Sequence, residues 1–231
     1  RQRDLELTAM MADDRRIPSV LFAGRHAGLA MVGETAIDAR PFERATAGRA
    51  GAQVGTATAE PVADAVAWFT DLAVRSARPA APADVAAAMA DLLARFRALC
   101  RPGAATVAGL EDAVAAIASS ASPFPVVFQH GDPGTWNLLV HDDGTVAVLD
   151  WENADAAGMP LWDLFYLLRS HAVGTGRRSS RFGGPWRMPR LTAVQRLLFE
   201  ESPLSEFVVA SIHGYADRIG LARTLVEPLF H

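Results

Sequence analysis

Apolar residues recur at two different spacings along the chain, and each spacing predicts its own kind of element. Short apolar runs over residues 19–23 and 29–34, rich in side chains that favour strands, predict a hairpin. Apolar positions three and four residues apart predict helices over residues 61–76, 82–99 and 110–119. We expect each of these helices to turn one face toward a common core.

The remaining segments continue this alternation of strands and helices. An imperfect helical stripe predicts a helix over residues 1–14, whereas residues 39–60, rich in Ala, Gly, Thr and Arg, predict an exposed connection without a long regular element. Residues 126–129 predict a short strand, and two further strands flank the turn at residues 141–144. Further helices are expected over residues 161–172 and within residues 192–231.

Length and charge narrow the class of protein. At 231 residues and 50% hydrophobic, the chain can bury a sizeable core, and its length allows one large domain or one and a half. A net charge of -4 provides no positive field for nucleic acid or an anionic membrane, so neither is an expected partner. Because the chain has no uncharged apolar run of about 18 residues and no signal pattern, we expect a cytoplasmic protein.

Two residue types restrict the chemistry further. The single cysteine, Cys100, excludes an internal disulfide and a cysteine-based zinc cluster, and we interpret it as a small buried apolar residue. All 22 basic residues are arginine, so chemistry that requires a lysine cannot come from this chain. The chain begins at Arg1 with a helical pattern already present, and we expect it to be a fragment of a longer reading frame.

Polar side chains gather at the ends of the predicted hairpin that turns at residues 141–144. The alternating apolar residues of its two strands do not need them for packing. Asn137 directly precedes one strand and Asp150 ends its partner, so strand pairing brings their oxygens to one edge. Two hard oxygen donors side by side suit Mg²⁺, which is completed by waters and substrate phosphates. The nearby Asp132 can accept the proton of an attacking hydroxyl.

Each of these residues also has a structural interpretation. Asp132, Asn137 and Asp150 could be caps and turn formers, but their joint occurrence favours a functional site. His130 is expected to hold the loop by hydrogen bonds rather than to act in catalysis. Asp163, directly before an apolar helix, is interpreted as an N-cap or a brace for the loop. Trp136 stays open between packing and substrate contact, and packing is expected for the remaining tryptophans, Trp68, Trp151, Trp162 and Trp186.

The spacing of these polar residues resembles that of a known family of enzymes. His-Gly-Asp at residues 130–132 with Asn137, followed by Leu-Asp-Trp-Glu at residues 149–152, resembles the catalytic loop and metal site of the aminoglycoside phosphotransferase and choline kinase family. Pro-Leu-Trp-Asp-Leu at residues 160–164 resembles a downstream signature of that family. The resemblance implies an ATP- and Mg²⁺-dependent phosphotransferase acting on a hydroxyl acceptor.

The resemblance also implies a fold and its division. We expect an α+β, protein-kinase-like two-lobe fold, with a partial N-lobe at residues 1–34 and a hinge at residues 35–39. A mostly helical C-lobe with the catalytic hairpin would follow at residues 40–231. Residues 17–21 resemble the entry to the fourth N-lobe strand, and residues 31–36 resemble the end of the fifth strand and the hinge.

Several site residues are expected only because of this resemblance. Asn137 and Asp150 match the two metal ligands, and Glu152 lies where members carry an acid near the metal. The nucleotide is expected at Glu34, Thr35 and Ala36. A phosphate-holding lysine is expected upstream of Arg1, facing Glu6, with Asp4 as the rival candidate.

Two functional hypotheses and one weaker option remain at this level. The first is a kinase that phosphorylates a small molecule such as a sugar, an amino alcohol or a related metabolite, with this fragment alone inactive. The second is a non-catalytic nucleotide-binding scaffold with the same fold. The third, a metal-dependent hydrolase, would require more histidine ligands than His130. The acceptor and the oligomeric state are not determined.

The arginine-rich segment at residues 174–190 bears on the acceptor. It carries five arginines among glycines with no acid between them. The segment could be a solvated loop. If it borders the acceptor site instead, it would repel a polycationic aminoglycoside.

Overall fold

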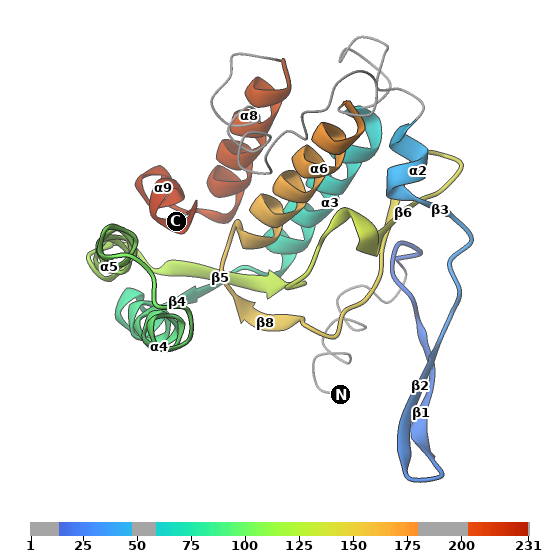
Figure 1. Ribbon diagram of the computed structural model, residues 1–231, viewed down its shortest axis with the longest axis horizontal. Coiled ribbons are helices and arrows are strands. Elements are labelled where there is room, and N and C mark those ends of the chain that lie inside the picture. Colours follow the sequence, from blue (N-terminus) through green and yellow to red (C-terminus); the bar gives the residue numbers. More distant parts are fainter. Residues whose placement is uncertain (1–13, 48–58, 180–202, 231) are drawn as a thin grey trace.

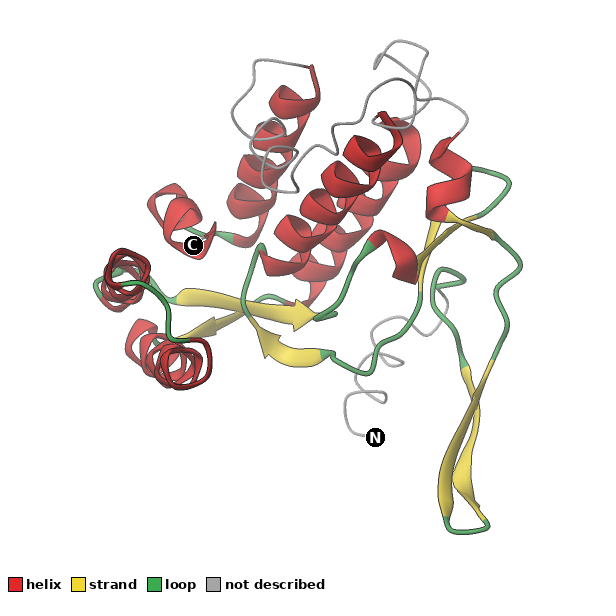
Figure 2. Cartoon of the chain, in the orientation of Figure 1, coloured by secondary structure: helices red, strands yellow, loops and turns green. Residues whose placement is uncertain are grey.

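The computed structural model describes residues 14–47, 59–179 and 203–230 (Figure 1). Three helices lie side by side at its centre, α3 (Ala59–Ser76), α6 (Trp162–Ser179) and α8 (Pro203–Ile219) (Figures 1 and 2). Helix α3 contacts both α6 and α8, and all three contribute to one hydrophobic cluster. The helix expected over residues 1–14 falls almost entirely outside the described residues.

The sequence of α3 explains why this helix forms the centre of the core. Its fully buried apolar residues recur at helical spacing, and Pro61 lies in the first turn, where its missing N–H is tolerated. The helix ends at Ser76, whose hydroxyl donates to the carbonyl of Leu72 at 2.7 Å and accepts the backbone N–H of Phe128 at 2.9 Å. The end of α3 is therefore tied directly to the strand that leads into the polar loop.

Two small antiparallel sheets carry that loop. In one, β5 (Phe124–Gln129) lies between β4 (Arg78–Ala80) and β8 (Asp155–Gly158). In the other, β6 (Leu138–Val140) lies between β3 (Arg40–Pro41) and β7 (Val146–Val148). Leu138 pairs with Val148, and the apolar side chains of β7 are all buried. The expected strand at 126–129 and the expected hairpin are thus both present.

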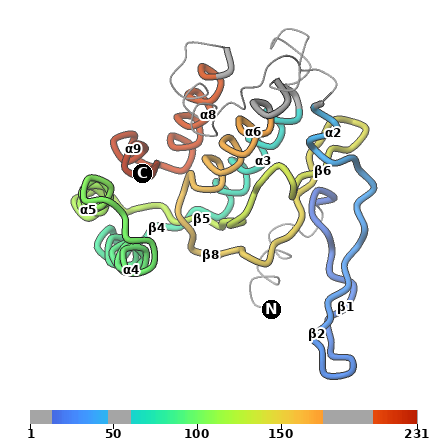
Figure 3. The backbone as a smooth tube through the Cα atoms, viewed as in Figure 1, coloured from blue at the N-terminus to red at the C-terminus, as the bar shows by residue number. Residues whose placement is uncertain are grey.

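The first hairpin, β1 (Val20–His26) and β2 (Leu29–Glu34), extends away from the helices (Figure 3). It matches the hairpin expected from the sequence. Ala27 and Gly28 both have positive φ, +49° and +84°, as the tight turn between the strands requires. Large apolar side chains such as Phe22 and Leu29 are exposed on it. The division of the chain at residues 34 and 39 stays a prediction.

Helices α4 (Pro82–Cys100) and α5 (Ala104–Ala118) pack against each other beyond the end of the sheet where β4 ends and β5 begins (Figure 1). The expectation that α4 buries its whole apolar stripe is wrong. Only Val85 and Ala86 are buried, whereas Leu99 is 83% exposed. The rest of the stripe is covered only in part, with Leu92 and Phe96 exposed as well. Cys100 at its end is exposed, which corrects the expectation of a buried cysteine.

The connection expected over residues 39–60 contains a short helix, α2 (Phe42–Ala47). The sequence pattern missed it because six residues are too few to show a helical period. Phe42 is 1% exposed and anchors the helix in the core. The C-terminal region adds a 3₁₀ turn, η3 (Arg223–Leu225), and α9 (Val226–Phe230), which contacts α5 and α6.

Candidate active site

The polar loop that follows β5 is held at its start by Asp163, in the first turn of α6. One oxygen of Asp163 accepts the backbone N–H of His130 at 2.6 Å, and the other accepts that of Gly131 at 3.0 Å. Burial raises the pKa of the Asp163 carboxyl to about 6, and the two N–H donors act in the opposite direction. Asp163 is therefore the brace of the loop, one of the two structural roles expected for it.

The ring of His130 fills the space beneath the loop and is fully buried. Its Nε2 lies 2.8 Å from the carbonyl of Leu149, and its Nδ1 accepts the backbone N–H of Asp132 at 3.2 Å. The Trp151 ring lies 4.4 Å from it, centre to centre. Burial lowers the pKa of His130, so the ring is held neutral. These contacts agree with a structural role for His130, because both ring nitrogens are engaged.

Gly131 allows the chain to turn sharply between this buried ring and Asp132. Its φ is +89°, in the left-handed region that favours glycine. A Cβ at this position would lie only 2.5 Å from the carbonyl oxygen of Asn153. Any other residue would both strain the backbone and push the loop away from the segment that follows Asp150.

Asp132 and Asn137 are locked together across the loop. The Asn137 side-chain amide donates to the Asp132 carbonyl at 2.9 Å and to Asp132 Oδ2 at 3.3 Å. The other carboxylate oxygen, Asp132 Oδ1, is buried and has no hydrogen-bond partner within the protein. A buried carboxylate oxygen without a donor is costly, so this atom is positioned to accept a hydrogen bond from a bound molecule.

The loop and the hairpin bring Asn137 next to Asp150. Asn137 belongs to the 3₁₀ turn η1 (Thr135–Asn137), and its carbonyl accepts the backbone N–H of Leu149 at 2.9 Å. Asp150 follows directly, is exposed, and has a φ of +64°, which is uncommon for a residue with a side chain. Backbone strain of this kind often marks a functional position. The two strand ends are therefore paired through Asn137 and Leu149, and the placement of the two side-chain oxygens on one metal stays a prediction.

Comparison with known proteins assigns this arrangement to a family. Residues 8–201 match the phosphotransferase enzyme family, which is most of the chain. The chain belongs to this family. The match includes Asp132, Asn137, Asp150 and Asp163, and it agrees with the resemblance inferred from the sequence.

Solved structures show the fold of the family member. A glucosamine kinase matches 99% of this chain at 19% sequence identity with a TM-score of 0.59, and the chain spans 61% of that protein. An aminoglycoside phosphotransferase from Streptomyces rimosus, in complex with ADP and streptomycin, matches at 19% identity with a TM-score of 0.48, over 100% of this chain and 81% of that one. No curated protein matches. The expected kinase-like α+β fold is confirmed.

The side-chain oxygens of Asn137 and Asp150 suit a Mg²⁺ ion that keeps several waters better than a metal site formed by protein ligands alone. In the described part of the chain, no three His, Cys, Asp or Glu residues gather closely enough to hold a metal ion. Mg²⁺ needs only one or two protein oxygens beside waters and phosphates, which Asn137 and Asp150 can provide. Glu152 is exposed two residues beyond Asp150, and no hydrogen bond or ion pair to another described residue fixes its position.

The residues expected to bind the nucleotide lie at the end of β2 and in the segment that follows it. Thr35 is tied to the base of the first hairpin, because its N–H donates to the Ser19 carbonyl and its hydroxyl accepts the Ser19 N–H, each at 2.9 Å. Within the described ranges, no hydrogen bond or ion pair joins Glu34, Thr35 or Ala36 to the Asp132 loop. Glu6 and Asp4, Trp186 and most of the arginine-rich segment at residues 174–190 lie outside the described residues.

Helix α6 supplies loop contacts that the sequence analysis missed. Asp163, Tyr166 and Ser170 lie on one face of this helix, at the spacing i, i+3 and i+7. The Ser170 hydroxyl accepts the backbone N–H of Thr135 at 3.1 Å, and the Tyr166 ring contacts the Trp136 ring. Once Asp163 is assigned as the brace of the loop, this spacing predicts that the same face of α6 follows the loop.

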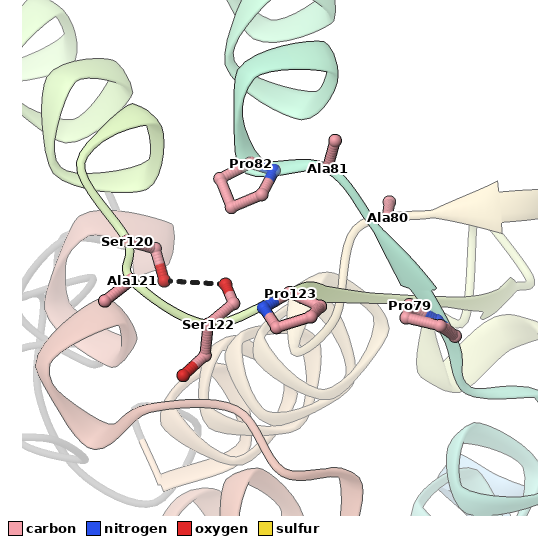
Figure 4. Close-up of a pocket in the computed structure, with 8 residues that line it drawn as sticks. All are labelled: Pro79, Ala80, Ala81, Pro82, Ser120, Ala121, Ser122 and Pro123. Carbon is pink, nitrogen blue, oxygen red and sulfur yellow. Dashed lines mark hydrogen bonds between the residues drawn. The ribbon is translucent and has the colours of Figure 1, made fainter.

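The groove in Figure 4 lies elsewhere and lacks this chemistry. It is formed where β4 leads into α4 and where α5 leads into β5, with a volume of about 420 Å³. Its lining consists of proline, alanine and serine, and one hydroxyl there, of Ser120, donates to the Ser122 carbonyl at 3.1 Å. No titratable side chain lines it, so the candidate site is the loop around Asp132.

None of the described helices is long and apolar enough to cross a membrane.

Proposed function

We propose that this protein transfers the γ-phosphoryl group of ATP to a hydroxyl group of a small molecule, in a reaction that depends on Mg²⁺. One observation carries the proposal: Asp132 Oδ1 is buried without a hydrogen-bond donor, although the rest of the loop is closely hydrogen-bonded. An acceptor hydroxyl is the kind of donor that this oxygen lacks. The family match supports phosphoryl transfer to a small molecule as the reaction class.

The reaction follows from the position of Asp132. The acceptor hydroxyl donates to the Asp132 carboxylate, which orients its oxygen toward the γ-phosphorus of the nucleotide. A bond forms between the acceptor oxygen and phosphorus, and the bond between phosphorus and the β–γ bridging oxygen breaks, so that ADP leaves. The hydroxyl proton passes to Asp132. Catalysis would consist mainly of positioning and charge neutralisation.

Asn137 and Asp150 would hold the magnesium ion, with Glu152 close to them. Bound there, the ion would neutralise negative charge on the nucleotide phosphates. The Asn137 amide nitrogen already donates to Asp132, which leaves its side-chain oxygen for the metal. The same amide thus couples the metal position to the general base.

The nucleotide would lie between this loop and the segment Glu34–Ala36. Because the N–H and hydroxyl of Thr35 are engaged by Ser19, the exposed backbone at Ala36 is the better candidate for contact with the base. The sequence contains no lysine, so none of these residues can supply the phosphate-holding lysine that the resemblance implies. Activity is accordingly proposed for the full-length protein and not for residues 1–231 alone.

The test is acceptor-dependent formation of ADP by the full-length protein. Phosphorylated products are followed by ³¹P NMR with a panel of sugars, amino alcohols and related hydroxyl compounds, with and without Mg²⁺. We expect product with at least one acceptor and none without Mg²⁺. Nucleotide binding without transfer to any acceptor would contradict the proposal and support a non-catalytic nucleotide-binding scaffold.

A further inference from the structure

Two aromatic side chains, Trp136 and Tyr166, lie beside the Asp132 carboxylate. Trp136 is 57% exposed although it belongs to the loop itself. Its ring lies over Gly134, where an added Cβ would be 2.3 Å from the indole. Its Nε1 donates a long hydrogen bond of 3.5 Å to Asp132 Oδ2, and the Tyr166 ring meets it edge-on with centres 6.0 Å apart. The exposed indole therefore has a defined orientation.

Arg169 adds a positive charge to this aromatic pair. Its guanidinium lies over the Tyr166 ring, 5.2 Å from the ring centre. Burial, followed by the negative charge of the nearby Asp132 carboxylate, raises the pKa of Tyr166. Arg169 is exposed, and within the described ranges it forms no ion pair with a carboxylate. Its charge is therefore available to a bound molecule.

These features together describe a binding surface for one chemical class. An exposed indole held in a fixed orientation offers an apolar face, which suits the ring of a sugar or a cyclic polyol. The buried Asp132 Oδ1 lacks a donor and suits a hydroxyl of the same molecule. Arg169 suits an anionic group, because guanidinium pairs well with carboxylate and phosphate.

We propose that Trp136, Tyr166 and Arg169 form the acceptor-binding wall beside Asp132, and that this wall takes a hydroxylated ring compound that carries a carboxylate or a phosphate. The inference rests on the proposed function, because it treats Asp132 as the group that receives the acceptor hydroxyl. An ammonium group is disfavoured at this wall, since Arg169 already covers the Tyr166 ring and repels a second cation. The acceptor would then not be an amino sugar such as the glucosamine for which the structural neighbour, glucosamine kinase, is named.

The test measures binding of three related sugars to the full-length protein without nucleotide. The probes are D-glucuronate, D-glucose and D-glucosamine, which share a ring and differ in charge, and affinities are measured by titration calorimetry. We expect glucuronate to bind most tightly and glucosamine most weakly. Arg169→Gln should weaken glucuronate about tenfold, the usual effect of losing one charged hydrogen bond, and leave glucose unchanged. Trp136→Ala should weaken all three.

Arg95→Gln is the matched control, because Arg95 is an exposed arginine on α4, outside this wall. It should change none of the affinities. The inference is overturned if glucosamine binds more tightly than glucuronate, if Arg169→Gln leaves the affinity for glucuronate unchanged, or if no probe binds at millimolar concentration. Failure of the proposed function would be seen separately, as the absence of phosphoryl transfer from ATP while the order of sugar affinities persists.

Discussion

The backbone N–H of Asp132 donates to Nδ1 of His130, so the buried ring beneath the loop fixes the residue that would act as the base. Because Nδ1 accepts this bond, the proton of the neutral ring must be on Nε2, where it is donated to the carbonyl of Leu149. The ring thereby joins the Asp132 loop to the strand end that carries Asp150. Both halves of the site depend on one neutral histidine.

This arrangement makes a prediction about the protonation of His130. We expect ¹⁵N NMR of the imidazole to show the form protonated at Nε2, with a pKa below the ordinary value of about 6.5. Unfolding exposes the ring and restores that ordinary value. The His130 contribution to stability should therefore be complete above about pH 6.5 and decline as the pH falls. An imidazole that titrates at its ordinary pKa would contradict the account.

Asp163 should act on stability in the opposite sense. Its pKa is raised to about 6 in the folded protein. Since the folded state then holds the proton more tightly than the unfolded state, stability should fall as the pH rises from about 4 to about 6, by up to about 3 kcal/mol. Urea unfolding across this range should show the decline in wild type. The variant Asp163→Asn cannot titrate and should lack it.

Asp163→Asn also leaves a single side-chain oxygen to accept the backbone N–H groups of His130 and Gly131. Above about pH 6 the variant should therefore be less stable than wild type by roughly 1–3 kcal/mol, the cost of an unsatisfied buried donor. Equal pH profiles for wild type and Asp163→Asn would show that another group is responsible for the dependence.

The turn at Gly131 gives a third prediction, with a control in the same chain. Gly131 and Gly144 have nearly the same φ, +89° and +87°, but an added Cβ at Gly144 meets nothing within 4 Å. Gly144→Ala should therefore cost only the backbone strain, about 1–2 kcal/mol. Gly131→Ala adds the clash with the Asn153 carbonyl and should cost clearly more in urea unfolding. Equal losses would mean that the loop adjusts without strain.

Much of the candidate site could be predicted because its residues lie close together in the sequence. Asn137 and Asp150 flank the two strands of one hairpin, and alternation of apolar residues fixes the register of that hairpin. Strand pairing then brings the end of one strand, at Asn137, beside the end of the other, at Leu149 and Asp150. His130 and Asp163 were assigned structural roles from residue type and position, and the observed hydrogen bonds agree with those roles.

The features that the sequence did not predict depend on which element packs against which. The stripe on α4 shows that one face is apolar, but the pattern does not show that α5 is the main described element packed against this helix. For that reason Leu99 and Cys100 were expected to be buried and are exposed. Tyr166 and Arg169 were missed because their place beside Asp132 depends on how α6 packs against the loop.

The metal assignment predicts a distinct defect for Asp150→Ala. Loss of this oxygen should weaken Mg²⁺-dependent nucleotide binding at least about tenfold, and excess Mg²⁺ should restore part of it. Asp142→Ala removes the same charge from the turn at the other end of the hairpin, where the side chain is fully exposed. It should leave nucleotide binding unchanged. If both variants bind nucleotide like the wild type at all Mg²⁺ concentrations, Asp150 is not a metal ligand.

The most direct measurement compares Asp132→Asn with wild type in the full-length protein, for both nucleotide affinity and phosphoryl transfer to an accepted substrate. The substitution keeps the size and polarity of the side chain and removes its ability to take a proton. We predict that ADP binding in the presence of Mg²⁺ is retained while turnover falls by about 10²–10⁴-fold, the range for loss of one general base. Turnover by Asp132→Asn equal to that of the wild type would contradict the assignment of Asp132 as the base, and with it the central claim.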